Sequence, residues 1–212
     1  MTLDLVIVGS GGFGREAADV VDAINAVSPT WNVVGFVDDS PTEENVARVG
    51  RRGSQILGPL SGIGDYAPGA HCVIGVGNPT TRQRLAALAG EAGMVPATLV
   101  HPTAVIGANS MIAPGSVICA FVAVGSDVTL GSHVHLDRGS HVGHDSVLED
   151  FVTVHPAAVI SGSCHIGTGV ELGTNSTLIQ EIRVGAHATV GAAACVVHDV
   201  PTNVTVKGVP AR

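Results

Sequence analysis

The sequence predicts two domains in series: a small Rossmann-like parallel α/β domain over residues 1–100, then a parallel β-helix over residues 101–212. Two observations support this prediction. The first hundred residues alternate short aliphatic runs with helical stretches, which is typical of a parallel sheet. From residue 106 to residue 196 every sixth residue is aliphatic, a period that neither a helix nor an isolated strand produces. A repeat of hexapeptides indicates a solenoid.

The hexapeptide repeat continues without a break through sixteen aliphatic positions. They are Ile106, Ile112, Ile118, Val124, Leu130, Leu136, Val142, Leu148, Val154, Ile160, Ile166, Leu172, Leu178, Val184, Val190 and Val196. We expect three hexapeptides to form one triangular coil with the aliphatic side chains inside, giving about five coils spaced by roughly 4.8 Å. Half of the residues that follow these positions are glycine. We expect those glycines to supply the positive φ angles of tight turns.

The first hundred residues have the pattern of a strand-helix alternation. We expect strands over residues 3–8, 33–37 and 72–76, and helices over residues 15–27 and 80–92. Residues 40–70 are rich in Gly and Pro, and no element is assigned to them. The sheet formed by these strands is expected to be parallel.

A glycine-rich motif follows the first expected strand. Gly9, Gly11 and Gly14 have the G-x-G-x-x-G spacing, the motif precedes a helix, and Asp38 and Asp39 end the next strand. Backbone amides at a helix N-terminus bind phosphate, and an acid at that strand end suits a ribose hydroxyl. The motif therefore predicts nucleotide binding. The domain is small for NAD, so a nucleotide with one pyrophosphate and a compact far end fits better, and a glycine turn without a ligand is the alternative.

One histidine of the repeat region has the setting of a general base. His144 lies two residues after the core position Val142, at a turn, and Asp145 follows it. A carboxylate beside an imidazole fixes its tautomer and raises its basicity. Gly162 lies eighteen residues later, one coil along, and is expected to leave space and a free N–H beside the ring. A solvated turn is the alternative interpretation of the His-Asp pair.

Composition excludes several other functions. The net charge of −8 and the absence of a basic run argue against nucleic-acid binding. The chain has ten histidines, but none of them are five residues apart, the spacing of the close zinc-ligand pair in γ-class carbonic anhydrases, which share a prism of this kind; we expect no metal. The chain shows neither a signal peptide nor a membrane segment, and its four cysteines have no disulfide pattern, so we expect a cytoplasmic protein.

The combination of these features resembles the NeuD/PglD-type bacterial nucleotide-sugar N-acetyltransferases of the hexapeptide-repeat acyltransferase superfamily. The resemblance covers essentially the whole chain. The matching segments are Gly9–Gly14, Gly35–Asp39, Val76–Asn78 with Arg82, His101–Pro102, the Val-x-His-Asp-Ser-Val frame around His144, and the closing Lys207–Arg212.

The resemblance implies a left-handed β-helix and a homotrimer with active sites between neighbouring subunits. It places a nucleotide-linked amino sugar on the N-terminal domain and acetyl-CoA along the prism. The implied sugar-nucleotide residues are Gly11, Gly12 and Phe13 at the pyrophosphate, Asp38 and Asp39 near the base and ribose, Gly77 and Asn78 nearby, and Asp137 near the amine. The implied acetyl-CoA residues are Thr153, His155, Thr174 and Ala192.

In this family the reaction is a direct attack without an acyl-enzyme. By resemblance, His144 removes a proton from the sugar amine, Asp145 tunes His144, and the Gly162 amide stabilises the oxyanion. Three positions depart from the family: Asp137 is often Asn, Thr153 is His in some members, and Asp145 is often Glu. These departures affect substrate contacts rather than the reaction class.

The predicted function is acetyl transfer from acetyl-CoA to the amine of a nucleotide-linked amino sugar, for surface polysaccharide or protein glycosylation. O-acetylation of a sugar such as sialic acid is an alternative, because the same base can serve a hydroxyl. A trimer that binds nucleotide sugars without catalysis is another, and a nicotinamide oxidoreductase fits least because a second substrate domain is lacking.

Overall fold

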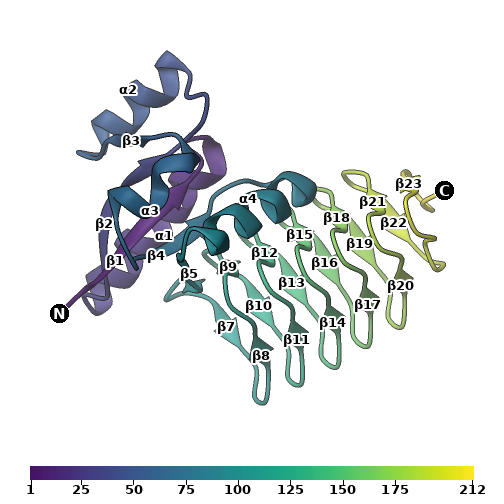
Figure 1. Ribbon diagram of the computed structural model, residues 1–212. Helices are drawn as coiled ribbons and strands as arrows, with labels where there is room; N and C mark the ends of the chain where they lie inside the picture. The colour runs from purple at the N-terminus through teal and green to yellow at the C-terminus, as the bar shows by residue number, and fades with distance from the viewer. The chain divides into compact units, whose positions relative to one another are not determined.

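The computed structural model describes residues 1–212, which form two compact units, Met1–Pro102 and Thr103–Arg212. Unit 1 contains a five-stranded parallel sheet with the order β3-β2-β1-β4-β5 (Figure 1). Its strands are β1 (Leu3–Val8), β2 (Trp31–Val37), β3 (Ile56–Gly58), β4 (His71–Ile74) and β5 (Val95–Pro96), and the short strand β6 (Leu99–Val100) follows. Its helices are α1 (Gly12–Val27), α2 (Glu43–Arg51), the 3-10 helix η1 (Leu60–Gly62), α3 (Ile63–Tyr66) and α4 (Pro79–Glu91).

The elements of unit 1 agree with the sequence prediction in type and differ at their ends. Strand β2 begins at Trp31, two residues earlier than expected, and α1 begins at Gly12 rather than residue 15. The unassigned segment 40–70 contains α2, β3, η1 and α3. Helix α2 has ordinary start signals: the Thr42 side chain accepts a hydrogen bond from Asn45 N, and two glutamates occupy its first turn.

Helix α1 packs through a stripe of small side chains. Gly14, Ala17, Ala18 and Val21 are buried, at the spacing of one helix face. Strand β1 is buried from Leu5 to Val8, as expected for the centre of a parallel sheet covered on both faces. This packing fixes the glycine turn at the carboxyl end of β1.

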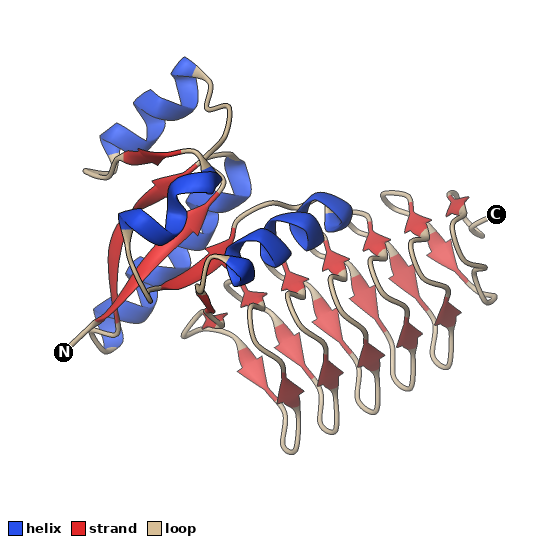
Figure 2. Ribbon diagram, in the orientation of Figure 1, coloured by secondary structure: helices blue, strands red, loops and turns tan.

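Unit 2 is a stack of two-residue strands joined by turns (Figure 2). The strands are β7 (Val105–Ile106), β8 (Met111–Ile112), β9 (Val117–Ile118), β10 (Ala123–Val124), β11 (Thr129–Leu130), β12 (His135–Leu136), β13 (His141–Val142), β14 (Val147–Leu148), β15 (Thr153–Val154), β16 (Val159–Ile160), β17 (His165–Ile166), β18 (Glu171–Leu172), β19 (Thr177–Leu178), β20 (Arg183–Val184), β21 (Thr189–Val190), β22 (Cys195–Val196) and β23 (Thr205–Val206). They form three parallel sheets, in the orders β22-β19-β16-β13-β10-β7, β20-β17-β14-β11-β8 and β23-β21-β18-β15-β12-β9. Partners within a sheet are eighteen residues apart, as His141 and Val159 are, so each coil holds three hexapeptides.

The repeated aliphatic positions form the core of the prism. From Ile118 to Val196 none of these side chains is more than 3% exposed, whereas Ile106 and Ile112 in the first coil are half-buried. Each aliphatic side chain stacks on its counterpart one coil away, which is the arrangement predicted from the period. The prism therefore holds the turns at fixed places on its edges.

The glycines of the repeat serve a purpose other than the expected one. Positive φ angles occur three residues after the aliphatic position, and non-glycine residues such as His133 (φ 55°) and Asp145 (φ 58°) adopt them. The glycines directly after the aliphatic residues instead allow a close approach between coils. A Cβ at Gly125 would lie 2.6 Å from His144 N, and one at Gly143 would lie 2.5 Å from Gly162 N. The expectation of positive φ at these glycines was wrong.

None of the helices combines the length and the apolar character needed to cross a membrane.

All four cysteines are free thiols, and burial raises the pKa of Cys72 to about 12.

Candidate functional site

The glycine motif of unit 1 divides into packing glycines and open glycines. Gly9 has a φ of +100°, and a Cβ at Gly14 would lie 1.9 Å from Gly9 O, so both positions exclude a side chain. At Gly11 and Gly12 a Cβ would meet nothing within 4 Å. The outer glycines thus fold the turn tightly onto the sheet, and the inner glycines leave a free surface in front of α1.

The N-terminus of α1 faces this free surface. Gly11 is the N-cap residue, and its position provides no side-chain acceptor for the first helix amides. The Arg15 guanidinium lies beside them and donates hydrogen bonds to Ser10 O and Asn45 Oδ1, both at 2.7 Å. Phe13 of the motif is half-buried. Uncapped amides together with a guanidinium favour an anion such as a pyrophosphate.

The two acids after β2 have different roles in the structure. Asp38 Oδ2 accepts hydrogen bonds from Ser10 N at 2.9 Å and Ser10 Oγ at 2.5 Å, and its Oδ1 accepts one from Ser40 N. Burial opposes ionisation of Asp38, but these hydrogen bonds outweigh it and lower the pKa of the carboxyl. Asp39 is exposed and uses Oδ1 for Leu60 N at 2.7 Å. Asp38 therefore braces the glycine turn, and Asp39 retains an open oxygen.

A pocket of about 210 Å³ lies at the carboxyl ends of β1, β2 and β4, and we call it the edge pocket. Its lining includes the aliphatic side chains Val37, Leu60, Val76 and Leu85 and the charged residues Asp38, Asp39 and Arg84. This edge of a parallel α/β sheet is where such folds bind their ligands. Gly9 of the glycine motif also lines the pocket. Of the residues predicted to bind the nucleotide sugar, the pocket includes Asp38 and Asp39 but not Gly11, Gly12, Phe13, Gly77 or Asn78.

Arg82 supports the loop that closes the edge pocket. Its side chain is fully buried on α4, and its guanidinium donates to Val76 O at 3.0 Å and Gly77 O at 2.7 Å. Asn78 caps the same helix by accepting from Thr81 N at 3.0 Å. A buried guanidinium is costly unless it is paired, so its use here indicates that the position of this loop matters. The sequence pattern contained Arg82 and assigned no task to it.

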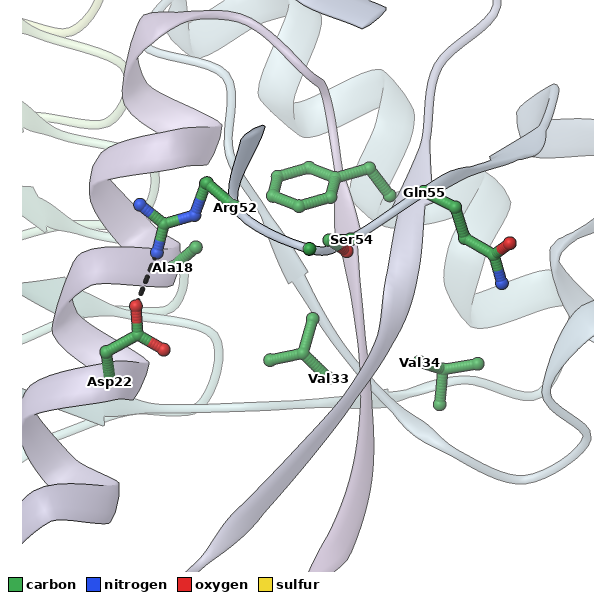
Figure 3. Close-up of a pocket in the computed structure, with 9 residues that line it drawn as sticks. Ala18, Asp22, Val33, Val34, Arg52, Ser54 and Gln55 are labelled. Atoms are coloured by element: carbon green, nitrogen blue, oxygen red, sulfur yellow. Dashed lines mark hydrogen bonds and ion pairs between the residues drawn. The ribbon is translucent and has the colours of Figure 1, made fainter. Parts of the chain in front are cut away.

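A larger cavity in unit 1, of about 520 Å³, contains none of the predicted site residues. Figure 3 shows Val33 and Val34 of β2 among the residues that line it, and Arg52 across from Asp22 of α1. Arg52 donates to Asp22 Oδ2 at 2.6 Å and also pairs with Asp19. This guanidinium is already paired with two carboxylates, so Arg52 does not offer the cavity a free cation. The larger volume alone does not indicate a functional site.

The predicted base of unit 2 lies on a turn between β13 and β14. His144 Nδ1 is 2.6 Å from Asp145 Oδ2, and the two side chains are 68% and 58% exposed. In the tautomer in which Nδ1–H donates a hydrogen bond to Asp145 Oδ2, Nε2 carries the free lone pair. The imidazole lies over Gly162, where a Cβ would come within 2.7 Å of both Cε1 and Nε2. Glycine at position 162 is thus required for this ring position.

The other residues predicted on the prism differ in accessibility. Thr174 and Ala192 are exposed, and His155 is half-buried with Nε2 3.5 Å from Glu171 Oε2. Asp137 is half-buried and accepts a hydrogen bond from Arg138 N. Thr153 is only 3% exposed, which argues against the expected direct contact between its side chain and CoA.

A further and closer histidine-carboxylate pair lies on the prism, and sequence reasoning missed it. His165 Nε2 is 2.8 Å from Glu149 Oε1, and Glu149 Oε2 accepts from Thr168 N and Oγ1. The hydrogen bonds from Thr168 and His165 lower the pKa of Glu149. His165 Nδ1 faces Arg183 at 3.4 Å, so both ring nitrogens have partners. A cavity of about 450 Å³ includes this pair.

No group of three or more His, Cys, Asp or Glu side chains is placed to hold a metal ion.

Comparison with known proteins finds relatives of both units. The PglD N-terminal domain model matches residues 4–88, and the bacterial transferase hexapeptide model matches residues 103–138. The chain is therefore similar to PglD-type proteins in unit 1 and to hexapeptide-repeat transferases in unit 2. A GDP-perosamine N-acetyltransferase from Escherichia coli O157:H7 is 28% identical to this chain, with 97% of this chain and 94% of that protein covered.

Solved structures that match the chain over its whole length have the same fold. The acetyltransferase domain of PglB from Neisseria gonorrhoeae, also solved with acetyl coenzyme A, superposes with a TM-score of 0.87 at 27% identity, covering 100% of this chain and 99% of that one. PerB from Caulobacter crescentus, solved with CoA and GDP-perosamine, gives a TM-score of 0.88 at 26% identity, covering 99% and 96%. These similarities confirm the resemblance and the left-handed β-helix, and they bear out the predicted enzyme class, an acetyl-CoA-dependent sugar N-acetyltransferase.

Proposed function

We propose that this protein transfers the acetyl group of acetyl-CoA to the amine of a nucleotide-linked amino sugar. The observation that carries the proposal is the position of the His144 ring. Its Nδ1 is hydrogen-bonded to Asp145, and its Nε2 lies over the turn at Gly162. Relatives that cover the whole chain act on, or were solved with, GDP-perosamine and CoA, which supports the substrate class.

Unit 1 would hold the nucleotide. The open surface at Gly11 and Gly12 suits the pyrophosphate, because uncapped helix amides and the Arg15 guanidinium provide donors and positive charge there. The edge pocket suits the base. Binding energy gained on this remote part of the substrate would position the sugar amine for reaction.

Unit 2 would carry out the chemistry in a single displacement. The neutral amine nitrogen attacks the thioester carbonyl carbon, and His144 Nε2 accepts the proton that the amine loses. Asp145 stabilises the resulting imidazolium through Nδ1. The Gly162 N–H, which donates to no acceptor within the chain, would donate to the developing oxyanion. Collapse of the tetrahedral species breaks the carbon–sulfur bond, and the departing thiolate takes up the proton that His144 Nε2 accepted, which leaves CoA as the thiol and returns His144 to its neutral form.

We also propose a cytoplasmic homotrimer with the acetyl-CoA and amino-sugar sites meeting between subunits. In that assembly Asp137 would lie near the amine, and His155, Thr174 and Ala192 would contact CoA. The exposure of His144, Thr174 and Ala192 in the single chain supports this arrangement, because residues at a subunit seam are open before assembly.

Thiol release over a panel of UDP-, dTDP- and GDP-linked amino sugars, with acetyl-CoA present, tests the proposal. We expect release with at least one amino sugar and none with the matching unaminated sugar nucleotides. Release with hydroxyl acceptors alone would favour the O-acetyltransferase alternative. Nucleotide-sugar binding without any thiol release would favour the non-catalytic trimer.

A further inference from the structure

We propose that Ser146 is a positioning residue for the acetyl transfer, and that its hydroxyl directs the Gly162 amide toward the developing oxyanion. This inference rests on the proposed function, because it concerns how the proposed oxyanion donor is held. Ser146 lies two residues after His144, at a corner of the prism, and its side chain is fully buried.

The Ser146 hydroxyl lies among backbone groups of the two turns that carry the proposed chemistry. Its oxygen accepts a hydrogen bond from Cys164 N at 3.1 Å. Its proton has two carbonyl acceptors within reach, Ser161 O at 3.3 Å and His144 O at 3.4 Å. A buried hydroxyl that donates to neither of them would be costly, so the proton goes to one of these two turns.

The carbonyl of Ser161 needs this proton more than the carbonyl of His144 does. Ser163 N already donates to His144 O at 2.8 Å. No backbone amide donates to Ser161 O, so the Ser146 hydroxyl is its hydrogen-bond donor within the chain. We therefore assign the hydroxyl proton to Ser161 O.

The Ser161 carbonyl and the Gly162 amide belong to the same planar peptide group. In a trans peptide the N–H points opposite to the C=O, so a hydrogen bond that fixes the carbonyl also fixes the direction of the amide. With Ser161 O turned toward the buried Ser146 hydroxyl, the Gly162 N–H is directed away from the interior of the prism. It does so on the turn over which the His144 imidazole lies.

Hydrogen bonds hold the groups on either side of this peptide but not the peptide itself. Ser161 N donates to Leu178 O at 3.1 Å, and Gly162 O accepts from Glu181 N at 3.0 Å. The Gly162 N–H between them donates to no acceptor in the chain. Because glycine tolerates a wide range of backbone angles, loss of the Ser146 bond would leave the Ser161–Gly162 peptide able to rotate.

The prism itself does not require a hydroxyl at this corner. The equivalent positions one coil before and two coils after Ser146 are Val128 and Ile182, and both side chains are buried. An aliphatic side chain is thus compatible with the fold here. Stability of the prism alone does not explain a hydroxyl at position 146.

Steady-state thiol release by a Ser146→Ala variant, with a sugar nucleotide that the unaltered protein accepts, tests the inference. We expect kcat to fall by about tenfold, less than the roughly 10²- to 10³-fold loss that removal of an oxyanion donor causes, because the amide is misdirected rather than absent. The KM values and the Kd of acetyl-CoA should change by no more than about twofold, because the oxyanion contact forms in the transition state. An unchanged kcat would overturn the inference.

Ser116→Ala is the matched control. Ser116 is fully buried at another corner, where its hydroxyl donates to Gly131 O and accepts from Val134 N, both at 3.1 Å. Each variant loses one hydroxyl that joins two coils, so the Tm values should fall by similar amounts, while only Ser146→Ala loses turnover. An equal loss of kcat in Ser116→Ala would indicate a general weakening of the prism and would overturn the inference.

Ser146→Cys is the conservative variant. Cys164 occupies the same corner one coil along, and its Sγ donates to Ile179 O at 3.3 Å, so a thiol can form this bond. We expect the kcat of Ser146→Cys to lie between those of Ser146→Ala and the unaltered protein, since a thiol is a weaker donor than a hydroxyl. A Ser146→Cys variant as slow as Ser146→Ala would count against the bond to Ser161 O.

A dithioester analogue of acetyl-CoA, in which sulfur replaces the carbonyl oxygen, tests whether Ser146 acts through the oxyanion. Sulfur is a weak hydrogen-bond acceptor, so the Gly162 amide contributes less to this reaction. We expect the loss in Ser146→Ala to shrink from about tenfold to about twofold with the analogue. A loss that stays at about tenfold would assign the effect to His144 instead and overturn the inference, while the proposed function would stand. Absence of thiol release from the unaltered protein with every amino sugar would defeat the proposed function instead.

Discussion

Two histidine-carboxylate pairs on the same prism differ in what their second ring nitrogen does. In His144–Asp145 the Nε2 atom faces away from the carboxylate, over a glycine turn, and the pair is exposed. In His165–Glu149 the Nε2 atom is hydrogen-bonded to the carboxylate, and Nδ1 faces the Arg183 guanidinium. A short distance between a histidine and a carboxylate is therefore not enough to identify the histidine as a general base. An imidazole can accept a substrate proton only if one nitrogen has no partner within the protein.

The largest effect expected from this difference is on turnover. Replacing His144 by Ala should lower kcat by about 10² to 10⁴-fold, because the amine loses its proton acceptor. The matched change His165→Ala should leave kcat within about twofold, since that ring has no nitrogen to offer. Thiol release at saturating substrates measures both. Equal losses in the two variants would remove the distinction between the pairs.

A change at the glycine under the first pair should have the next largest effect. In Gly162→Ala the new Cβ would overlap Cε1 and Nε2 of His144, so the imidazole must move. This displacement of the imidazole is expected to lower kcat by about 10²-fold, while the Kd of acetyl-CoA changes little. Gly50→Ala in α2, where a Cβ meets nothing within 4 Å, is the control. Unchanged turnover in Gly162→Ala would show that the ring position over this turn is unimportant.

Removing the charge of the first carboxylate should have a smaller effect. Asp145→Asn keeps a side-chain oxygen near Nδ1 but no longer stabilises the imidazolium, and the pair is well exposed to solvent. We expect kcat to fall by about tenfold, well below the loss seen for a buried triad aspartate. Thiol release at saturating substrates measures kcat, and circular dichroism checks that the fold is retained. Full activity of the Asp145→Asn variant would contradict the tuning role.

The second carboxylate should affect stability rather than rate, and only modestly. The pKa of Glu149 is lowered in the folded chain, so its contribution to stability is present above its ordinary pKa and is lost as pH falls through the folded value. Glu149→Gln should therefore lower Tm by a few degrees near pH 7, and the difference from the unaltered protein should shrink toward pH 3. Thermal melts followed by circular dichroism at several pH values measure it. A difference that grows on acidification would have the wrong sign for this account.

The sequence predicted the prism because its core positions repeat without a break. Leu148 and its counterparts are buried as the period requires, and His144 was located by its offset from Val142. The pair His165–Glu149 was missed because its members are sixteen residues apart, on different coils. Only a register of one coil against the next, such as Val147 beside His165, brings them together.

Unit 1 was harder to predict where local signals were short. Helix α2 was missed within the Gly- and Pro-rich segment, although the Thr42 cap and its two following glutamates mark its start. The division of labour between Asp38 and Asp39 depends on hydrogen bonds from Ser10 and Leu60, which are distant in sequence. The role of the repeat glycines was misjudged, because close contact between coils is invisible to turn preferences.

Rescue of the His144→Ala variant by added imidazole tests most directly whether His144 supplies the proton acceptor for acetyl transfer, because a free imidazole can enter the exposed position that the side chain leaves. We expect thiol release from the variant to rise with imidazole concentration while that of the unaltered protein does not. A His144→Ala variant that turns over at nearly the normal rate without imidazole would contradict it.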